Sequence, residues 1–323
     1  MLPLTEEQIR GLAEEDIETL SRYDAAGLLL RPGDTIGSFR ERLLSLSEQL
    51  KKIDEELASP EGCRLFDGFS FCATERIPDE IMKESAEATE TLFRFSANWA
   101  PGFFLSKSLG ILWGGCTLSF PDTHLSVFII RANFATSPKW FIYRRDELLA
   151  HELCHAARSP LGGDSFEEHF AYMTSTSILR RYLGNCFRRA SDAFLFIVPV
   201  FVLLLAQLAT TFTPLLLPIW PFWVIAALGP AFLLWRNHCD RKTYRRAEAN
   251  LEKAGISNAK ALLFRCTENE IRGIAKLGKD SAFLTEHLEK MSVSELRWRI
   301  IKHRFIDKTH RMEVLPHDTT IEA

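Results

Sequence analysis

Several features that would assign a chain to a functional class are missing from this sequence. The first residues contain neither a basic start nor an apolar run, so we expect no secretory signal peptide. The seven cysteines are scattered and form no Cys-x-x-Cys pair. This excludes a disulfide framework and a cysteine zinc knuckle, and it is typical of a reducing compartment. A net charge of -3 provides no excess of positive charge, so no nucleic-acid partner is expected.

Charge is also missing from one long internal stretch. Residues 193–235 contain no Asp, Glu, Lys or Arg. As a single helix this stretch would be roughly 65 Å long, about twice the ~30 Å hydrocarbon core of a bilayer. We therefore predict a transmembrane hairpin with spans at 193–212 and 215–235, and a lipid bilayer as its partner. Thr210, Thr211, Thr213 and Pro214 mark the turn between the spans.

Basic residues flank the uncharged stretch on both sides. Arg188 and Arg189 precede it, and Arg236, Arg241 and Arg245 follow it. Because short basic flanks stay on the cytoplasmic side of a membrane, the sequence predicts a multi-pass membrane protein whose two termini are both cytoplasmic.

A metal-binding pattern occurs in residues 144–158, which read Arg-Arg-Asp-Glu-Leu-Leu-Ala-His-Glu-Leu-Cys-His-Ala-Ala-Arg. No Gly or Pro interrupts them, so we predict a helix with Asp146 as its N-cap. On that helix His151 and His155 are one turn apart on one face, and both imidazoles can bind the same ion. Glu152 would lie beside them and take a proton from a zinc-bound water. The pattern therefore predicts a Zn²⁺ site with Glu152 as the general base.

A third protein ligand is expected on the helix that follows. Glu167 and Glu168 compete for this role. If Asp164 is the N-cap, Glu167 is its capping-box partner and Glu168 is free to face the metal; if Ser165 is the N-cap, Glu168 is the structural residue. His169 would point about 100° away from Glu168. The capping argument favours Glu168.

The segment His151-Glu152-Leu153-Cys154-His155, followed by Glu168-His169-Phe170-Ala171, resembles the gluzincin group of metallopeptidases. In that group His-Glu-x-x-His lies on one helix, a glutamate on the next helix completes the zinc shell, and several members have an alanine three residues after that glutamate. The resemblance covers about residues 125–180. It implies that His151, His155 and Glu168 bind zinc and that Glu152 is the general base. The chain departs from the group at Tyr172, where many members have an aspartate, and in the short gap between His155 and Glu168.

Two β-branched and aromatic runs precede the motif, at residues 125–131 and 140–143, and we predict both to be strands. In gluzincins an edge strand beside the active-site helix binds the substrate backbone. Either run is a candidate for that strand, and either is equally well explained as a core strand. Tyr172 and Tyr182 are both candidates for stabilising an oxyanion, and the spacing selects neither.

These patterns predict a helix-rich α+β fold. We expect a mainly helical N-terminal region at 1–100 and a zinc peptidase unit at 101–190, built from a small sheet and two active-site helices. The transmembrane hairpin and a helical cytoplasmic region at 236–323 follow. Within that last region, residues 292–305 are predicted to form a basic amphipathic helix that lies either on anionic lipid or against the peptidase unit.

The expected function is that of a membrane-anchored zinc metallopeptidase. It would hydrolyse a peptide or protein substrate, such as a membrane protein, on the cytoplasmic side. The alternative is a non-catalytic membrane scaffold or regulator with a structural or vestigial metal site. Because a structural zinc site fills four protein positions, a fourth ligand such as His124 or His169 would favour the alternative, and an open coordination position would favour the enzyme.

Overall fold

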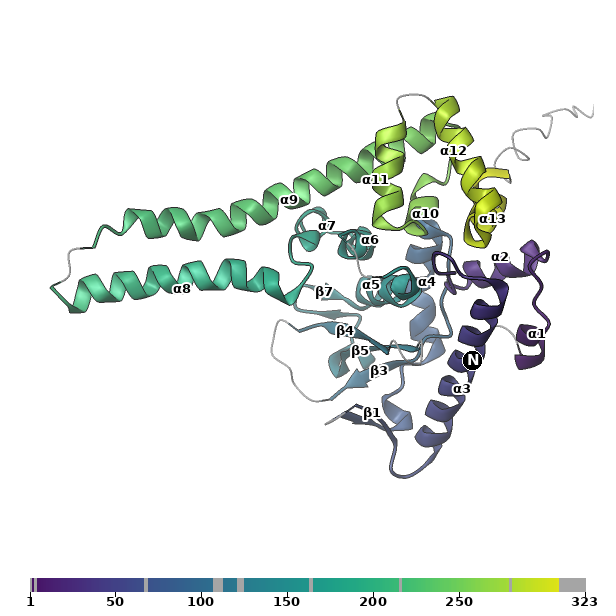
Figure 1. The fold of residues 1–323 in the computed structure, drawn as a ribbon. Helices are drawn as coiled ribbons and strands as arrows, with labels where there is room; N and C mark the ends of the chain where they lie inside the picture. The colour runs from purple at the N-terminus through teal and green to yellow at the C-terminus, as the bar shows by residue number, and fades with distance from the viewer. Residues whose placement is uncertain are drawn as a thin grey trace, which may run out of the picture.

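The computed structural model describes residues 2, 5–66, 69–106, 113–120, 125–162, 165–214, 217–278 and 281–307. It shows the predicted helix-rich α+β fold with small sheets (Figure 1). The N-terminal part contains α1 (Glu6–Arg10), α2 (Ile17–Ala25), α3 (Ile36–Ala58) and α4 (Asp79–Phe93), and a two-stranded sheet of β1 (Cys63–Phe66) and β2 (Phe69–Phe71).

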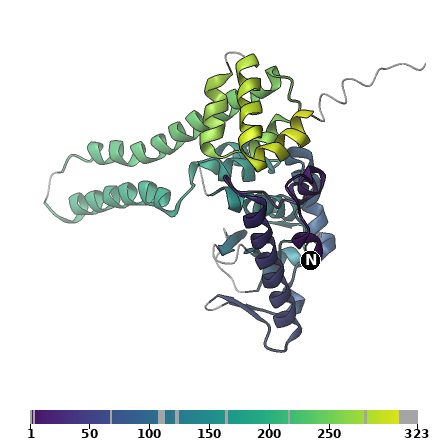
Figure 2. The same ribbon diagram turned by 45° about the vertical axis from the view of Figure 1, so that its right-hand side comes forward.

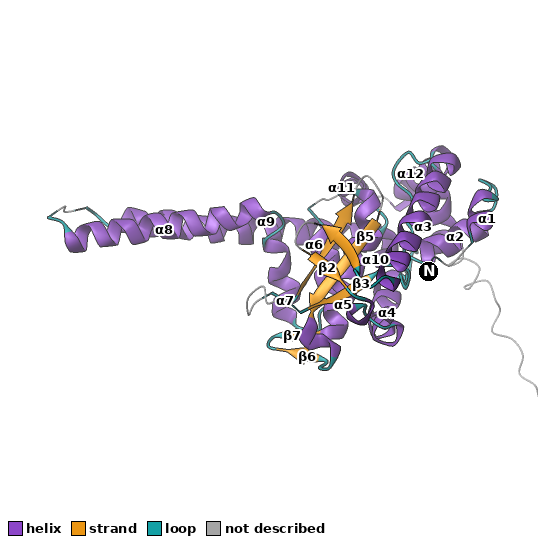
Figure 3. Ribbon diagram, turned by 90° about the horizontal axis from the view of Figure 1, so that it is seen from below, coloured by secondary structure: helices purple, strands orange, loops and turns teal. Residues whose placement is uncertain are grey.

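A three-stranded sheet supports the central part of the molecule (Figure 3). Its strand order is β3 (Gly102–Leu105), β5 (Leu125–Arg131), β4 (Gly115–Phe120). All seven residues of β5 are buried, because β3 and β4 pair with its two edges and the helices α3 and α5 pack against it. The predicted strand at 125–131 is confirmed. Of the two interpretations left open for this run, the structure shows the core strand, since both of its edges are paired; β4 is the edge strand in the described chain.

The second predicted strand, at 140–143, is wrong as one continuous element. Its residues belong to a hairpin of β6 (Lys139–Trp140) and β7 (Tyr143–Arg144). The chain reverses at Phe141, whose φ of 51° is in the left-handed region. Aromatic and β-branched residues favour strands, but they do not reveal a two-residue turn that lacks glycine, asparagine and aspartate.

Buried phenylalanines join elements that are far apart in the sequence. The rings of Phe93 at the end of α4 and Phe264 in α10 (Ala259–Phe264) stack with centroids 4.4 Å apart. Phe170, from α6 (Glu167–Met173), meets both of these rings edge-on. Each fully buried ring contributes about 1.5–3 kcal/mol to stability. This cluster fixes α6, and with it the second half of the predicted metal site, against the rest of the core.

Two long helices project from the body of the molecule side by side (Figures 1 and 2). They are α8 (Ala190–Phe212) and α9 (Trp220–Lys253). Gly229 allows their close approach, because a Cβ at this position would clash with the carbonyl oxygen of Leu195. At the base, Arg236 Nη2 lies 2.7 Å from Asp192 Oδ2, so the chain returns to the place where it left the body.

One helix of the described chain is long and apolar enough to cross a membrane, namely Ser191–Phe212, of which 11% is buried. It coincides with the first predicted span, and α8 ends at the predicted turn. The prediction of a second span at 215–235 is wrong: α9 begins at Trp220, and residues 215–216 lie outside the described residues. The apolar part of α9, up to Trp235, is only about 24 Å long, shorter than the ~30 Å core of a bilayer.

The chain after α9 forms a helical cap on the body, made of α10, α11 (Glu268–Leu277), α12 (Ser281–Ser294) and α13 (Leu296–Lys302). The predicted single helix at 292–305 is interrupted at Glu295, whose backbone is extended. Leu296, Trp298 and Ile301 are buried, so α13 packs against the body and does not present an apolar face to lipid. Its continuation, residues 303–307, is a short π-helix.

Candidate metal centre

The helix α5 (Arg145–Arg158) carries the two histidines. Its N-cap is Arg144, so the prediction of Asp146 as N-cap is wrong; Asp146 is the second helical residue and pairs with Arg144, Nη2 to Oδ2, at 2.7 Å. A carboxylate in the first turn still interacts favourably with the helix dipole. Leu149 and Leu153 are buried against the core, which directs the face bearing the histidines towards an open pocket.

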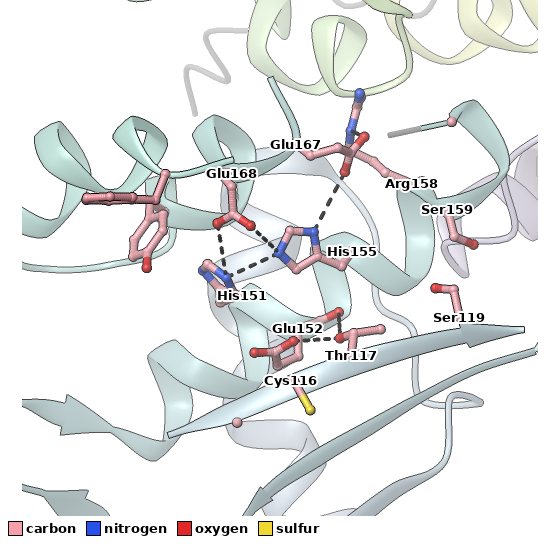
Figure 4. Close-up of a pocket in the computed structure, with 14 residues that line it drawn as sticks. Cys116, Thr117, Ser119, His151, Glu152, His155, Arg158, Ser159, Glu167 and Glu168 are labelled. Carbon is pink, nitrogen blue, oxygen red and sulfur yellow. Dashed lines mark hydrogen bonds and ion pairs between the residues drawn. The ribbon is translucent and has the colours of Figure 1, made fainter. Parts of the chain in front are cut away.

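Three potential ligands converge between α5 and α6 (Figure 4). His151 Nε2 and His155 Nε2 are 3.2 Å apart. The Glu168 carboxylate lies 3.7 Å from His151 Nε2 and 3.6 Å from His155 Nε2. Four ligands about 2.0–2.1 Å from a tetrahedral zinc ion are separated from one another by about 3.3–3.4 Å. The three groups therefore have the chemistry and spacing to hold one such ion.

The neighbours of Glu168 face elsewhere. Glu167 Oε1 accepts a hydrogen bond from Arg158 Nε at 2.8 Å, and Glu167 Oε2 lies 3.8 Å from His155 Nδ1. His169 is buried on another side of α6, with its ring 4.5 Å from that of Tyr244. The structure thus brings Glu168, and neither Glu167 nor His169, to the Nε2 atoms of both histidines.

The capping argument that favoured Glu168 is nevertheless wrong. The N-cap of α6 is Phe166, which makes no side-chain capping bond. Asp164 lies outside the described residues, as does His124, one of the predicted fourth ligands. The position of Glu167 is explained by its ion pair with Arg158, whose guanidinium is fully buried and lies over the ring of Phe170.

The group of three has one open side. In the part of the chain that the structure describes, no fourth His, Cys, Asp or Glu completes it. It borders a pocket of about 590 Å³, lined on the opposite wall by Cys116, Thr117 and Ser119 of β4. A site with three protein ligands and access to solvent is typical of catalytic zinc and differs from the closed shell of structural zinc.

Glu152 lies in the same pocket, between the histidines and β4 (Figure 4). Its side chain is buried, and Oε2 accepts a hydrogen bond of 2.6 Å from Thr117 Oγ1. Burial raises the pKa of Glu152, while His155 and the Thr117 hydroxyl oppose that rise. The hydrogen bond from Thr117 therefore holds the carboxyl group in one orientation, and its raised pKa makes it a better proton acceptor.

The two histidines have opposite electrostatic surroundings. Burial, followed by the charges of His155 and Arg180, lowers the pKa of His151 well below its ordinary value. Burial alone would also lower the pKa of His155, but the carboxylates of Glu167, Glu168 and Glu152 outweigh it and raise the pKa to about 9. Because ligands must be deprotonated, a metal ion that binds here displaces a proton from His155.

Other contacts orient the histidine rings. Tyr172 meets the His151 ring edge-on at 4.6 Å, and Glu167 faces Nδ1 of His155. Sequence reasoning missed the roles of Glu167, Arg158 and Thr117. No local pattern links Arg158 to Glu167 or Thr117 to Glu152, because each pair joins two different elements.

The two tyrosines considered for an oxyanion site are separated. Tyr172 lines the pocket, and its ring packs directly against Gly184, where any Cβ would clash with the ring. Tyr182 does not line this pocket and lies under the guanidinium of Arg241. Of the two, only Tyr172 is placed to contact a substrate in this pocket.

Comparison of the chain with protein-family models, with curated proteins and with solved structures finds no match. The resemblance to gluzincins therefore rests on His151, His155 and Glu168 alone.

Proposed function

We propose that this protein is a zinc-dependent hydrolase that cleaves peptide bonds. The observation that carries the proposal is the spacing of His151 Nε2, His155 Nε2 and the Glu168 carboxylate, 3.2 to 3.7 Å apart at the edge of an open pocket. These three groups would hold the ion. Zinc, when bound, polarises a carbonyl group and makes an adjacent water acidic.

Glu152 would act as the general base. It follows His151 in α5 and reaches the same pocket, where Thr117 fixes its carboxylate. It would take the proton of the attacking water and then deliver it to the leaving amine. Tyr172, on the wall formed by α6, is the side chain placed to donate a hydrogen bond to the carbonyl oxygen as charge develops there.

The edge strand β4 supports a peptide as the substrate. In the described chain β4 pairs with β5 alone, so its other edge, which faces the pocket, retains unpaired backbone groups. An extended peptide would bind there by adding a strand, which places a backbone carbonyl between β4 and α5. Backbone pairing is independent of side chains and favours substrates in an extended conformation.

The projection, formed by α8 and the first half of α9, would anchor the enzyme in a membrane. Large apolar side chains cover α8 and the first half of α9, including Phe194, Phe201, Trp223 and Leu228, all exposed. Because Asp192 and Arg236 meet at the base, α8 and the apolar part of α9 would enter the bilayer from the same side, with α8 long enough to cross it and α9 embedded over part of its depth. The arginines at this base favour the cytoplasmic side, where both termini and the metal centre would lie.

Phe187 connects the pocket with the membrane anchor. It lines the pocket, is half exposed, and precedes α8 by a few residues. The substrates that we propose are therefore segments of membrane proteins exposed at the bilayer surface. The competing role, a scaffold with a structural metal site, would require a fourth protein ligand.

The test compares cleavage and metal content in the purified full-length chain. Wild-type protein is expected to bind about one equivalent of zinc and to hydrolyse casein or an unstructured peptide. Glu152→Gln should keep the zinc while its turnover falls by roughly 10²–10⁴-fold. Glu168→Gln should lose both zinc and turnover, and Glu87→Gln, at an exposed position on α4, should lose neither. Undiminished cleavage by Glu152→Gln would disprove the assigned base, and wild-type protein without affinity for zinc would disprove the whole proposal.

A further inference from the structure

Beyond its apolar part, α9 has two different faces. One face packs against the body through residues that recur every three or four positions, namely Asn237, Asp240, Tyr244, Ala247 and Leu251. The opposite face is basic: His238, Arg241, Lys242 and Arg245 follow the same helical spacing, and Arg246 lies beside them. The second half of α9 is thus a helix that is buried on one side and positively charged on the other.

A cleft opens on this basic face, with a volume of about 400 Å³. Tyr182 of α7 (Ile178–Leu183) forms the second wall of the cleft. The helix α7 lies beside α9 where α9 joins the body (Figure 1). Asn237 Nδ2 donates to the Tyr182 carbonyl oxygen at 2.7 Å and fixes this junction. No acidic residue is among those that line the cleft.

Within the described part of the chain, the cations of the cleft form no ion pair, although the charge of Glu248 acts on Arg245. The nearby acidic residues of α9 pair with other cations: Asp240 with Arg188 and Arg272, and Glu248 with Lys260. No carboxylate of the described residues forms an ion pair with Lys242, Arg245 or Arg246.

Arg241 is held in place at the floor of the cleft. Its Nη1 donates to the carbonyl oxygen of Arg181 at 2.7 Å, and its guanidinium lies 5.1 Å from the centre of the Tyr182 ring. Its Nε is buried without a hydrogen-bond partner. Burial, and then the charge of Arg245, lowers the pKa of Arg241. A group of neighbouring cations that line one cleft without a carboxylate among them is stabilised by an anion.

We propose that the cleft between α7 and α9 binds a phosphate group, such as that of an anionic lipid headgroup or a free phosphate. The position of the cleft suits a lipid. Arg241 lies about 9 Å along the helix axis from Trp235, the last exposed aromatic residue of the apolar part. This is the depth at which headgroups lie above the hydrocarbon core, and basic clusters directly beside a membrane helix bind anionic headgroups. The choice of a lipid rests on the proposed membrane anchor; the inference uses no residue of the metal centre and does not depend on peptidase activity.

The experiment titrates the full-length chain in a neutral detergent with three probes by calorimetry: dihexanoyl phosphatidylglycerol, dihexanoyl phosphatidylcholine and inorganic phosphate. Lys242→Gln/Arg245→Gln removes two exposed charges of the cleft. Lys253→Gln/Lys276→Gln removes two exposed charges outside it and is the matched control. Lys242→Arg/Arg245→Lys retains the charges and shows whether the fold tolerates substitution at these positions.

We expect phosphatidylglycerol to bind saturably with a Kd below roughly 1 mM. The cleft double variant should bind about thirty-fold more weakly, since each basic residue beside an anionic surface contributes about 1 kcal/mol. The control pair and the charge-retaining pair should bind like wild type. Preference for phosphatidylglycerol over inorganic phosphate assigns the site to lipid, and the reverse preference assigns it to a soluble phosphate. The proposal would be overturned if the cleft double variant and the control double variant bound the probes with equal affinity. It would also be overturned if no probe saturated the wild-type protein.

Discussion

At the residue scale, the site depends on the direction of two adjacent carboxylates. Successive residues of a helix point about 100° apart, so Glu168 faces Nε2 of both histidines while Glu167 faces Nδ1 of His155 and the guanidinium of Arg158. A carboxylate at the second ring nitrogen orients a metal-bound histidine and makes it a better ligand. We therefore expect Glu167 to be a positioning residue for the proposed metal centre.

Glu167→Gln should weaken zinc binding by roughly 10–100-fold with little change in protein shape, because the amide keeps the size of the side chain but loses its charge. The measurement is competition for zinc with a chelator of known affinity, and Glu87→Gln serves as the neutral control. Thermal unfolding of the metal-free proteins provides the second readout. If Glu167→Gln lowers only the stability and leaves zinc affinity unchanged, then Glu167 serves Arg158 alone and the positioning role is wrong.

At the scale of elements, a buried ion pair joins two helices of the C-terminal cap, α11 and α13. Arg297 of α13 is buried, and its Nη2 lies 2.5 Å from Glu270 Oε1 of α11. The same oxygen accepts a hydrogen bond from Trp298 Nε1 at 2.7 Å. Burial alone would raise the pKa of Glu270, but Arg297 and the hydrogen bonds outweigh it, and the pKa lies below its ordinary value of 4.5.

The stability contributed by Glu270 should therefore depend on pH with a defined sign. A carboxyl group whose pKa is depressed by folding stabilises the protein above pH 4.5, and this contribution is lost as the pH falls through the folded-state pKa. Glu270→Gln should lower the free energy of unfolding by about 1–3 kcal/mol at pH 7, and the difference from wild type should shrink below pH 4.5. Thermal unfolding of both proteins between pH 7 and pH 3.5 measures this.

The control for this prediction is the exposed pair of Lys302 and Glu289, which joins α12 to α13 at the surface. Glu289→Gln should change the stability by less than about 1 kcal/mol at any pH. A difference between wild type and Glu270→Gln that stays constant with pH would contradict the argument.

At the scale of the whole molecule, the projection and the body are separable in structure. The projection contacts the body at its base, where Asp192 and Arg236 meet, and its large apolar side chains are exposed along most of its length. In water such a surface favours association, whereas in a bilayer it is solvated. The candidate metal centre is built from α5 and α6; α4 and the sheet support α5, and Phe264 of α10 packs against Phe170 of α6.

Replacing residues 193–235 by a short Gly/Ser linker should therefore release the protein from membranes without loss of zinc. The adjacent ends make a short linker sufficient, since Asp192 and Arg236 are in contact. We expect the full-length chain to resist extraction with alkaline carbonate, and the shortened chain to be soluble with about one equivalent of zinc. Recovery of the full-length chain in the soluble fraction would contradict the membrane anchor, and loss of zinc from a folded shortened chain would contradict the separability.

The sequence by itself determined the features that depend on neighbouring residues. The four-residue spacing of His151 and His155 places both on one face of any helix, and the uncharged run at 193–212 makes an apolar helix wherever it lies. The strand at 125–131 was predictable for the same reason, since its residues all suit a buried strand.

Only the tertiary structure decided which groups meet across the pocket. Glu168 joins the histidines because the phenylalanine cluster fixes α6, and Thr117 reaches Glu152 because β4 takes the edge of the sheet. The limited length of the apolar part of α9 and the cleft of Tyr182 and Arg241 likewise follow from how the helices begin and pack. Contacts between residues distant in the chain depend on the packing of the whole core, which local periodicity does not encode.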